Sequence, residues 1–368
     1  MKKSLIALAA VAASGAAMAQ SSVTLFGIVD TGVTYVNGAT NWSGMTTSGN
    51  ASSRIGFRGT EDLGGGLKAN FWLEAGLAGD VGSGAGGKEP GNGDTSLQFK
   101  RRSTVGLEGG FGEIRLGREL TAAYNATSRY DVFGQVGTGS SKLWGNGNRG
   151  SVQYQGVTSI LDAAPVRVSN AITYISPNFS GFKFGVNYGF GEVAGNNSAN
   201  RYFGGGLTYD NGPLSLGLSA ERQNTVPGVL LGAAARDVTA WAIGGSYNFG
   251  VVKLAGAYSD NKAKNVVTGN KDKSKGYYVG LSAPVGAAGE VKAAYNRYQV
   301  AMVGADKQKA DQFSLGYVHS LSKRTAVYGT YAYIKNKNNG ALGITLGNGT
   351  LKSNGSQHGL QVGVRHSF

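Results

Sequence analysis

The strongest constraint on this chain is a strict alternation of apolar and polar side chains, repeated in segments of about ten residues. Successive side chains of a β-strand point to opposite sides, so each segment predicts a strand with one apolar and one polar face. The last segment shows the pattern clearly. One face carries Leu360, Val362, Val364, His366 and Phe368, and the other carries Gln361, Gly363, Arg365 and Ser367.

About sixteen such segments follow one another, and the connections between them alternate between short turns and long loops. This layout is typical of outer-membrane barrels. In lipid every backbone polar group needs a partner, so strands can span a bilayer only as a closed barrel. We expect strands near 23–35, 53–60, 67–78, 98–108, 111–118, 167–176, 181–190, 201–209, 214–223, 237–248, 251–260, 275–283, 289–300, 311–319, 325–335 and 356–368.

A soluble β-sandwich would also alternate, but two features favour a membrane barrel. The polar faces consist mostly of small or neutral residues, which suits a water-filled lumen, and aromatic residues recur near the ends of the apolar faces. The 62 Gly, 6 Pro and absent Cys fit many short strands joined by glycine turns. The mean hydropathy of −0.16 and the lack of a long apolar run exclude a helical membrane protein. The sequence therefore predicts an all-β fold, a transmembrane antiparallel up-and-down β-barrel of about sixteen strands.

The first nineteen residues have the features of a secretory signal. Met1, Lys2 and Lys3 form a basic start, an apolar stretch follows, and Ala17-Met18-Ala19 fits a small-x-small cleavage site. We expect residues 1–19 to be a cleaved signal peptide and residues 20–368 to form a single barrel domain.

The formal charge of +14 admits nucleic acid, an anionic membrane surface or an anion pathway as partners, and the export signal argues against nucleic acid. A predicted external loop at 261–274 and the residue after it hold several lysines, which would steer anions towards the mouth of a channel. Gly82–Lys88 matches part of a P-loop, but Glu89 stands where Ser or Thr is needed and no βαβ unit surrounds it. The three histidines, His319, His358 and His366, are too scattered for a metal site. We expect no enzymatic activity and no cofactor.

Three strand starts carry arginines that predict a basic wall inside the barrel. Arg54 and Arg167 share the polar faces of their strands, and at Arg101 and Arg102 the alternation favours Arg102 as the lumen-facing residue unless a bulge exchanges the two. These three strands run in the same direction, so their first residues lie at one height. Glu74, at the end of the strand between the first two, places one acid within this wall. The alternative is that each arginine only extends to the membrane interface.

The connection from Glu119 to about Pro165 is far longer than a hairpin turn. Tyr124, Tyr130 and Phe133 supply aromatics that can pack, and Asp131 supplies an acid. We expect this third loop to fold into the lumen and narrow it, although a loop standing in solvent is the alternative.

Taken in order, several short motifs resemble the trimeric general-diffusion porins of Gram-negative bacteria in their betaproteobacterial form. They are VTLFG (23–27), SRIGFRGTEDLG (53–64), FGEIRLGR (111–118), SPNFSGF (176–182) and the terminal Phe368. The resemblance implies sixteen strands, a homotrimer in the outer membrane, and a constriction where a basic wall faces acids on the inward third loop. By motif, that wall would hold Arg54, Arg101 or Arg102, and Arg167, with Glu74 among them and Asp131 as the loop acid. The chain departs from the family in its long, glycine-rich loop 79–97 and in its expanded stretch 135–165.

These expectations lead to a passive channel for small anionic and neutral solutes, surrounded by outer-membrane lipid and lipopolysaccharide. Phe368, Val364 and Val362 would form the closing strand and resemble the signal that the barrel-insertion machinery reads. We also expect close approach of neighbouring copies at Gly27, Gly56 and Gly106. A surface adhesin with a plugged lumen and an outer-membrane hydrolase remain as alternatives.

Overall fold

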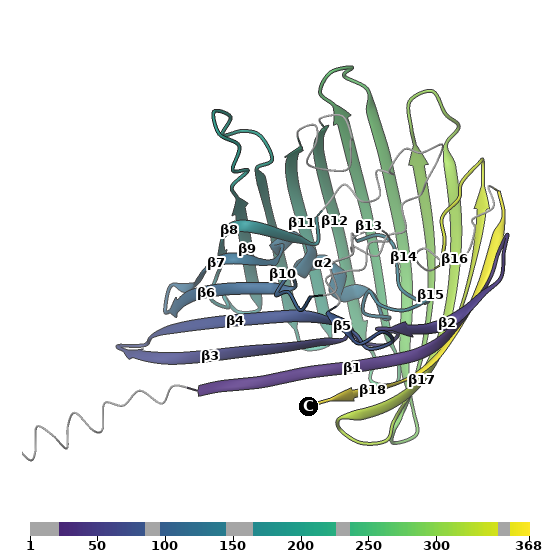
Figure 1. Ribbon diagram of the computed structural model, residues 1–368, viewed down its shortest axis with the longest axis horizontal. Helices are drawn as coiled ribbons and strands as arrows, with labels where there is room; N and C mark the ends of the chain where they lie inside the picture. The colour runs from purple at the N-terminus through teal and green to yellow at the C-terminus, as the bar shows by residue number, and fades with distance from the viewer. Residues whose placement is uncertain (1–21, 85–95, 145–164, 226–235, 345–353) are drawn as a thin grey trace, which may run out of the picture.

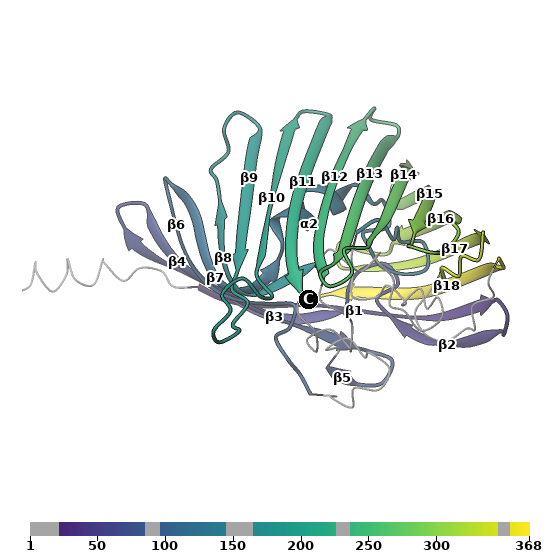
Figure 2. The same cartoon turned by 90° about the horizontal axis from the view of Figure 1, so that it is seen from above.

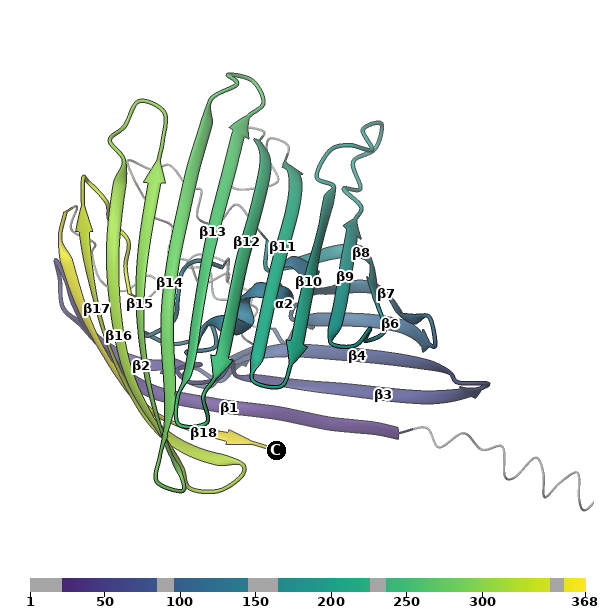
Figure 3. The ribbon, with the colours of Figure 1, turned by 180° about the vertical axis from the view of Figure 1, so that it is seen from behind.

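The computed structural model describes residues 22–84, 96–144, 165–225, 236–344 and 354–368. Sixteen antiparallel strands form a ring that the pairing of β1 with β18 closes (Figure 1 and Figure 3). The barrel strands are β1 (Ser22–Asn37), β3 (Arg54–Gly64), β4 (Leu67–Ala78), β6 (Arg102–Gly109), β7 (Gly112–Leu120), β8 (Arg167–Ile175), β9 (Phe182–Gly189), β10 (Tyr202–Asn211), β11 (Leu214–Thr225), β12 (Arg236–Asn248), β13 (Lys253–Asn265), β14 (Lys271–Val285), β15 (Gly289–Ala301), β16 (Gln308–Ser320), β17 (Thr325–Lys337) and β18 (Ser356–Ser367). The expected architecture is confirmed, whereas the expected signal peptide at 1–19 lies outside the described residues.

Two further short strands are not members of this ring. β2 (Trp42–Thr47) folds back against β1, and β5 (Ser83–Gly84) pairs with the C-terminal end of β4. β5 belongs to a segment that projects away from the barrel (Figure 2). Among the described residues no helix is both long and apolar enough to cross a bilayer.

The alternation seen in the sequence separates an outer from an inner surface. On β18 the side chains of Val362 and Val364 are about half exposed, at 50% and 51%, whereas Gln361 is 3% exposed and faces the interior. Phe368 follows the same outward pattern, and its ring lies over Gly27, where an added Cβ would be 2.2 Å from the ring atom Cζ. The backbones of Phe368 and Gly27 exchange two hydrogen bonds of 3.1 Å, which close the barrel at its periplasmic end.

The structure corrects two expectations about exposed positions. The predicted loop at 261–274 is mostly strand, because β13 continues to Asn265 and β14 begins at Lys271. Its lysines therefore lie on the outward-facing positions of a tall hairpin. Of the three glycines expected at a contact between copies, only Gly27 faces outward. Gly56 and Gly106 face the lumen, where they lie against Phe26 and Arg115 respectively.

The described part of the third loop, L3 (residues 121–144 and 165–166), enters the barrel as expected. Its helix α2 (Ala122–Thr127) begins at Thr121, whose hydroxyl accepts a hydrogen bond of 3.1 Å from the backbone of Tyr124. The 3₁₀ turn η1 (Ser128–Tyr130) follows, and α2 lies inside the ring of strands (Figure 2). Further along, the backbone N–H of Lys142 donates to Tyr298 Oη on β15 at 2.8 Å, so the described part of L3 crosses the inner surface from β9 to the far wall.

Glycines on the inner faces of β10 and β11 allow L3 to lie directly on the wall. A Cβ at Gly206 would be 2.4 Å from the backbone oxygen of Ala122, and one at Gly217 would be 2.2 Å from that of Ala126. Backbone oxygens cannot swing aside as side-chain ends can. The small residues of these inner faces therefore form the surface on which L3 packs, in addition to lining the lumen.

The first external segment is held inside the barrel by Asp30 of β1, which is fully buried. Its carboxylate accepts hydrogen bonds from the backbone N–H groups of Gly49, Asn50 and Ala51 at 3.2, 2.7 and 2.6 Å. It also accepts a hydrogen bond of 2.6 Å from Tyr328 Oη on β17, a side chain that reaches across β18. We call this set the Asp30 network. It draws the turn between β2 and β3 down against the inner wall.

Candidate functional site

The inner wall formed by β3, β4, β6 and β8 carries a compact group of arginines around one carboxylate. Glu74 is 9% exposed, and its Oε1 lies 2.5 Å from Nε of Arg101. Nε of Arg167 donates a hydrogen bond of 2.8 Å to the backbone oxygen of Arg101, and Arg54 lies close enough to interact electrostatically with both Glu74 and Arg101. We call Arg54, Arg101, Arg167 and Glu74 the arginine cluster.

Strand register explains why residues so distant in sequence meet. Gly56 is the β3 partner of Glu74, which places Arg54 one step further along the same face, and Arg102 is the β6 partner of Glu74. Arg101 directly precedes β6, and its backbone N–H donates to the backbone oxygen of Glu74 at 3.1 Å. Three strands that are neighbours in the ring thus bring their ends to one place.

The structure places both Arg101 and Arg102 on the lumen side. Arg101 turns to Glu74, while Arg102 donates from Nε to Thr104 Oγ1 at 3.0 Å and lies 4.0 Å from Glu119. Alternation along a regular strand selects only one of the two. The alternation does not apply to Arg101, because this residue lies just before β6 begins.

Next to Arg102 a second set of charges joins one arginine to two carboxylates. Arg115 contacts Glu113 at 2.5 Å and Glu119 at 3.0 Å. Asn70 donates a further hydrogen bond of 2.9 Å to Glu113. Two carboxylates beside one guanidinium leave a net negative charge, which Arg102 offsets from 4.0 Å away, so this group adds no positive excess, in contrast to the arginine cluster.

Asp131 lies away from the arginine cluster, buried between L3 and the wall with 5% exposure. Its carboxylate accepts hydrogen bonds from the backbones of Phe133, Gln135 and Ser141, and from the Gln135 side chain. Burial raises the pKa of Asp131, while these hydrogen bonds act in the opposite direction. Within the described residues no hydrogen bond or ion pair joins Asp131 to an arginine, so the acid beside the arginines is Glu74, on the wall itself.

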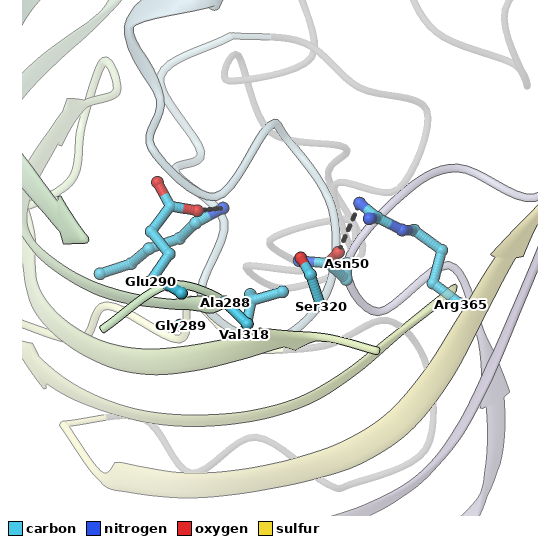
Figure 4. A pocket seen from close by; sticks show the side chains of 9 residues that line it. Asn50, Ala288, Gly289, Glu290, Val318, Ser320 and Arg365 are labelled. Atoms are coloured by element: carbon cyan, nitrogen blue, oxygen red, sulfur yellow. Dashed lines mark hydrogen bonds and ion pairs between the residues drawn. The ribbon is translucent and has the colours of Figure 1, made fainter. Parts of the chain in front are cut away.

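A polar recess of about 320 Å³ lies on another part of the inner wall, between the start of β15 and the ends of β16 and β18 (Figure 4). Arg365 donates to Asn50 Oδ1 at 3.0 Å there, and Lys292 pairs with Glu290 at 3.4 Å. Asn50 is held in place by the Asp30 network. Positive side chains therefore line the lumen on more than one wall.

Sequence reasoning missed the role of two aromatic side chains on the same inner wall. Phe26 on β1 and Trp72 on β4 lie edge to face with ring centroids 5.1 Å apart, and two arginines stack on them. The signal was present, because Trp72 shares the polar parity of Glu74 and Phe26 interrupts a face that should be polar. An aromatic residue at a lumen-facing position therefore indicates a ring that faces the channel.

Comparison with known proteins agrees with this architecture. The family model described as Gram-negative porin matches residues 5–339. Outer membrane porin protein 32 of Delftia acidovorans is 47% identical over 377 aligned residues and covers all of both chains. Another outer membrane porin protein, from Bordetella pertussis, is 32% identical, again over all of both chains.

A solved structure described as an anion-selective porin from Comamonas acidovorans superposes with a TM-score of 0.78. It is 43% identical and the match covers 95% of this chain and 100% of that one. The closed ring of sixteen strands, the inward third loop and these full-length relatives lead to one conclusion: the chain belongs to the Gram-negative porins, water-filled channels of the outer membrane.

Proposed function

We propose that this porin passes small anionic and neutral hydrophilic solutes by passive diffusion with a preference for anions, and that the arginine cluster sets this preference. The observation that carries the proposal is the grouping of three guanidinium groups around a single carboxylate on the lumen wall. The excess of positive charge faces the path of the solute. Arg102, a fourth guanidinium, lies next to this group.

Position makes these charges more effective than their number suggests. A channel with low-dielectric walls focuses the electric field, so a charge on the wall acts strongly on an ion that passes close to it. Two unit charges 4 Å apart interact by about 1 kcal/mol in bulk water and by about 4 kcal/mol at an effective dielectric near 20. Charges on the outer rim act through water and salt, which screen them within about 8–10 Å.

The solved relative supports the same preference, since it is described as an anion-selective porin. The test is the reversal potential of the wild-type channel in a planar lipid bilayer under a KCl gradient. We expect the sign that corresponds to chloride permeating faster than potassium. A potential of the opposite sign would exclude the proposed preference, and the absence of a stable large conductance would favour a plugged barrel.

We further propose that the protein has no catalytic activity and needs no cofactor, since diffusion through a water-filled lumen requires neither. Residues 1–19 would be removed on export, leaving residues 20–368 as one barrel domain.

We also propose that the working unit is a homotrimer. Arg118 of β7 has the outward parity of its strand and is satisfied there by the backbone oxygen of Lys100 at 2.6 Å and by Ser169 Oγ at 2.7 Å. A guanidinium on the lipid side of a barrel is costly, whereas a contact with a second copy can cover it. The remaining outer surface would meet membrane lipid and lipopolysaccharide. A band of trimer mass on mild-detergent electrophoresis that dissociates only on heating is the expected result, and a monomer under all mild conditions would contradict it.

A further inference from the structure

The aromatic pair, Phe26 and Trp72, forms a platform on the lumen wall next to the arginine cluster. Both side chains are partly exposed, and their rings meet at 64°. Gly56, on the strand between them, makes this contact possible. A Cβ at that position would be 2.4 Å from Cζ of Phe26 and 2.7 Å from the backbone oxygen of Leu73.

Two guanidinium groups lie on this platform. Cζ of Arg58 is 5.2 Å from the ring centroid of Trp72 and 5.4 Å from that of Phe26, and Cζ of Arg102 is 4.6 Å from the ring centroid of Trp72. Arg58 is the β3 partner of Trp72, and Arg102 reaches the same ring from β6 on the other side. Attraction between a cation and an aromatic face holds such groups flat without neutralising their charge.

The two arginines differ in what else they contact. Arg102 has Thr104 and Glu119 as partners. Arg58 is exposed to the lumen and has no ion pair or hydrogen bond with any residue in the described ranges. Its donors are therefore free to bind a passing anion, while the platform fixes the plane of the guanidinium.

Solutes can reach these rings, in contrast to two tyrosines on another part of the inner wall. Tyr278 on β14 and Tyr298 on β15 are 2% and 1% exposed because L3 covers them, and its backbone donates a hydrogen bond to each hydroxyl. The platform also adjoins the arginine cluster directly, since Trp72 Nε1 donates to Glu74 Oε2 at 3.3 Å. Arg58 lies four residues beyond Arg54 along β3, towards the periplasmic turn. An anion that leaves the cluster meets this site next.

We propose that Phe26, Trp72, Arg58 and Arg102 form a binding site for aromatic carboxylates, solutes that combine one carboxylate with a planar ring. The inference rests on the proposed anion preference. The carboxylate binds the free donors of Arg58. The ring stacks on the exposed face of the guanidinium or on the edge of the aromatic pair, and this contact favours planar aromatic rings over saturated ones of equal charge.

The test measures how benzoate, cyclohexanecarboxylate and acetate reduce the chloride current of the wild-type trimer in a planar bilayer. Benzoate and cyclohexanecarboxylate have the same charge and similar size, so a difference between them reports stacking. We expect benzoate to halve the current at about a fivefold lower concentration than cyclohexanecarboxylate, with acetate weakest. Equal inhibition by the two ring compounds would overturn the inference.

Variants identify the residues. Trp72→Leu with Phe26→Leu should abolish the difference between the two ring compounds, and Arg58→Gln should weaken inhibition by both. Trp72→Phe should restore part of the preference, which separates loss of the ring from a disturbed wall. Arg365→Gln, which removes an arginine from the wall shown in Figure 4, should keep the preference for benzoate.

Failure of the proposed function is distinguishable from failure of this inference. A wild-type reversal potential that favours potassium would remove the anion preference itself. A chloride-preferring wild type with an undiminished benzoate preference in the Trp72→Leu, Phe26→Leu variant would contradict only the aromatic site. Heat-modifiable trimer on electrophoresis confirms folding of each variant, and equal inhibition of the wild type by the two ring compounds overturns the inference even where a variant does not fold.

Discussion

At Glu74 a single carboxylate forms an ion pair with Arg101 and interacts electrostatically with Arg54 and Arg167, so one negative charge lies among three positive charges. Strand parity and strand direction predicted Arg54 and Glu74 on one wall, whereas at the start of β6 parity favoured Arg102 over Arg101, the residue that pairs with Glu74. The sequence did not predict that Asp131 would turn away from the lumen, since the path of a loop depends on hydrogen bonds to distant strands. Residues such as Tyr278, whose hydroxyl donates to the Asp131 carboxylate at 3.4 Å, cannot be associated with L3 from sequence spacing.

We expect replacement of Arg54 and Arg167 together by Ser to move the reversal potential towards neutrality. Both charges lie on the lumen wall, and a loss of about 1 kcal/mol corresponds to a roughly fivefold fall in the chloride-to-potassium permeability ratio. Lys271→Ser with Lys273→Ser is the matched control, because those side chains lie on outward-facing positions of β14 and should change the ratio little. An equal shift in both double variants would show that the arginine cluster does not set selectivity.

Asp131 and Glu74 should respond differently to the loss of charge. Asp131→Asn replaces an acceptor oxygen by a donor among the backbone N–H groups of Phe133, Gln135 and Ser141, and should destabilise the fold by about 1–3 kcal/mol. Thermal dissociation of the trimer measures this change. Glu74→Gln should instead increase the preference for chloride, because it removes the acid beside three arginines. A change in selectivity without loss of stability in Asp131→Asn would place that residue in the ion path.

At the scale of elements, the period of two was sufficient to locate the barrel strands. The expected segment 214–223 corresponds to β11 (Leu214–Thr225), and 275–283 lies within the longer β14 (Lys271–Val285). The short elements β2, β5 and α2 were not predicted. Each has too few residues to show a period, and each is stabilised by contacts with the wall that sequence alone does not reveal.

Adding one methyl group tests whether L3 depends on its close packing against the glycines of β10 and β11. Gly217→Ala places a Cβ about 2.2 Å from the backbone oxygen of Ala126, which should destabilise the packed loop by about 1–3 kcal/mol and lower the temperature at which the trimer dissociates. Gly256→Ala is the control, because its Cβ would lie 3.7 Å from the backbone oxygen of Tyr278, an ordinary contact. Equal stability of the two variants would mean that L3 does not depend on this surface.

At the scale of the whole molecule, the seam between β1 and β18 that closes the ring ends at the last residue of the chain. Removing Phe368 deletes two backbone hydrogen bonds to Gly27 and the ring that covers this glycine on the outer surface. We expect less folded trimer in the outer membrane, both because the seam is weakened and because we propose that Phe368, Val364 and Val362 are read by the insertion machinery. Heat-modifiable trimer quantified in membrane fractions is the measurement. Normal amounts would argue against both contributions.

The Asp30 network sets an order of events in time. Asp30 lies on the first strand of the barrel, while its tyrosine partner lies on the last strand but one, 298 residues later. During synthesis the carboxylate exists long before Tyr328 does, and the two meet only when the two ends of the sheet join. We therefore expect the first external segment that is synthesised to acquire its final shape only when β1 and β18 pair and seal the barrel.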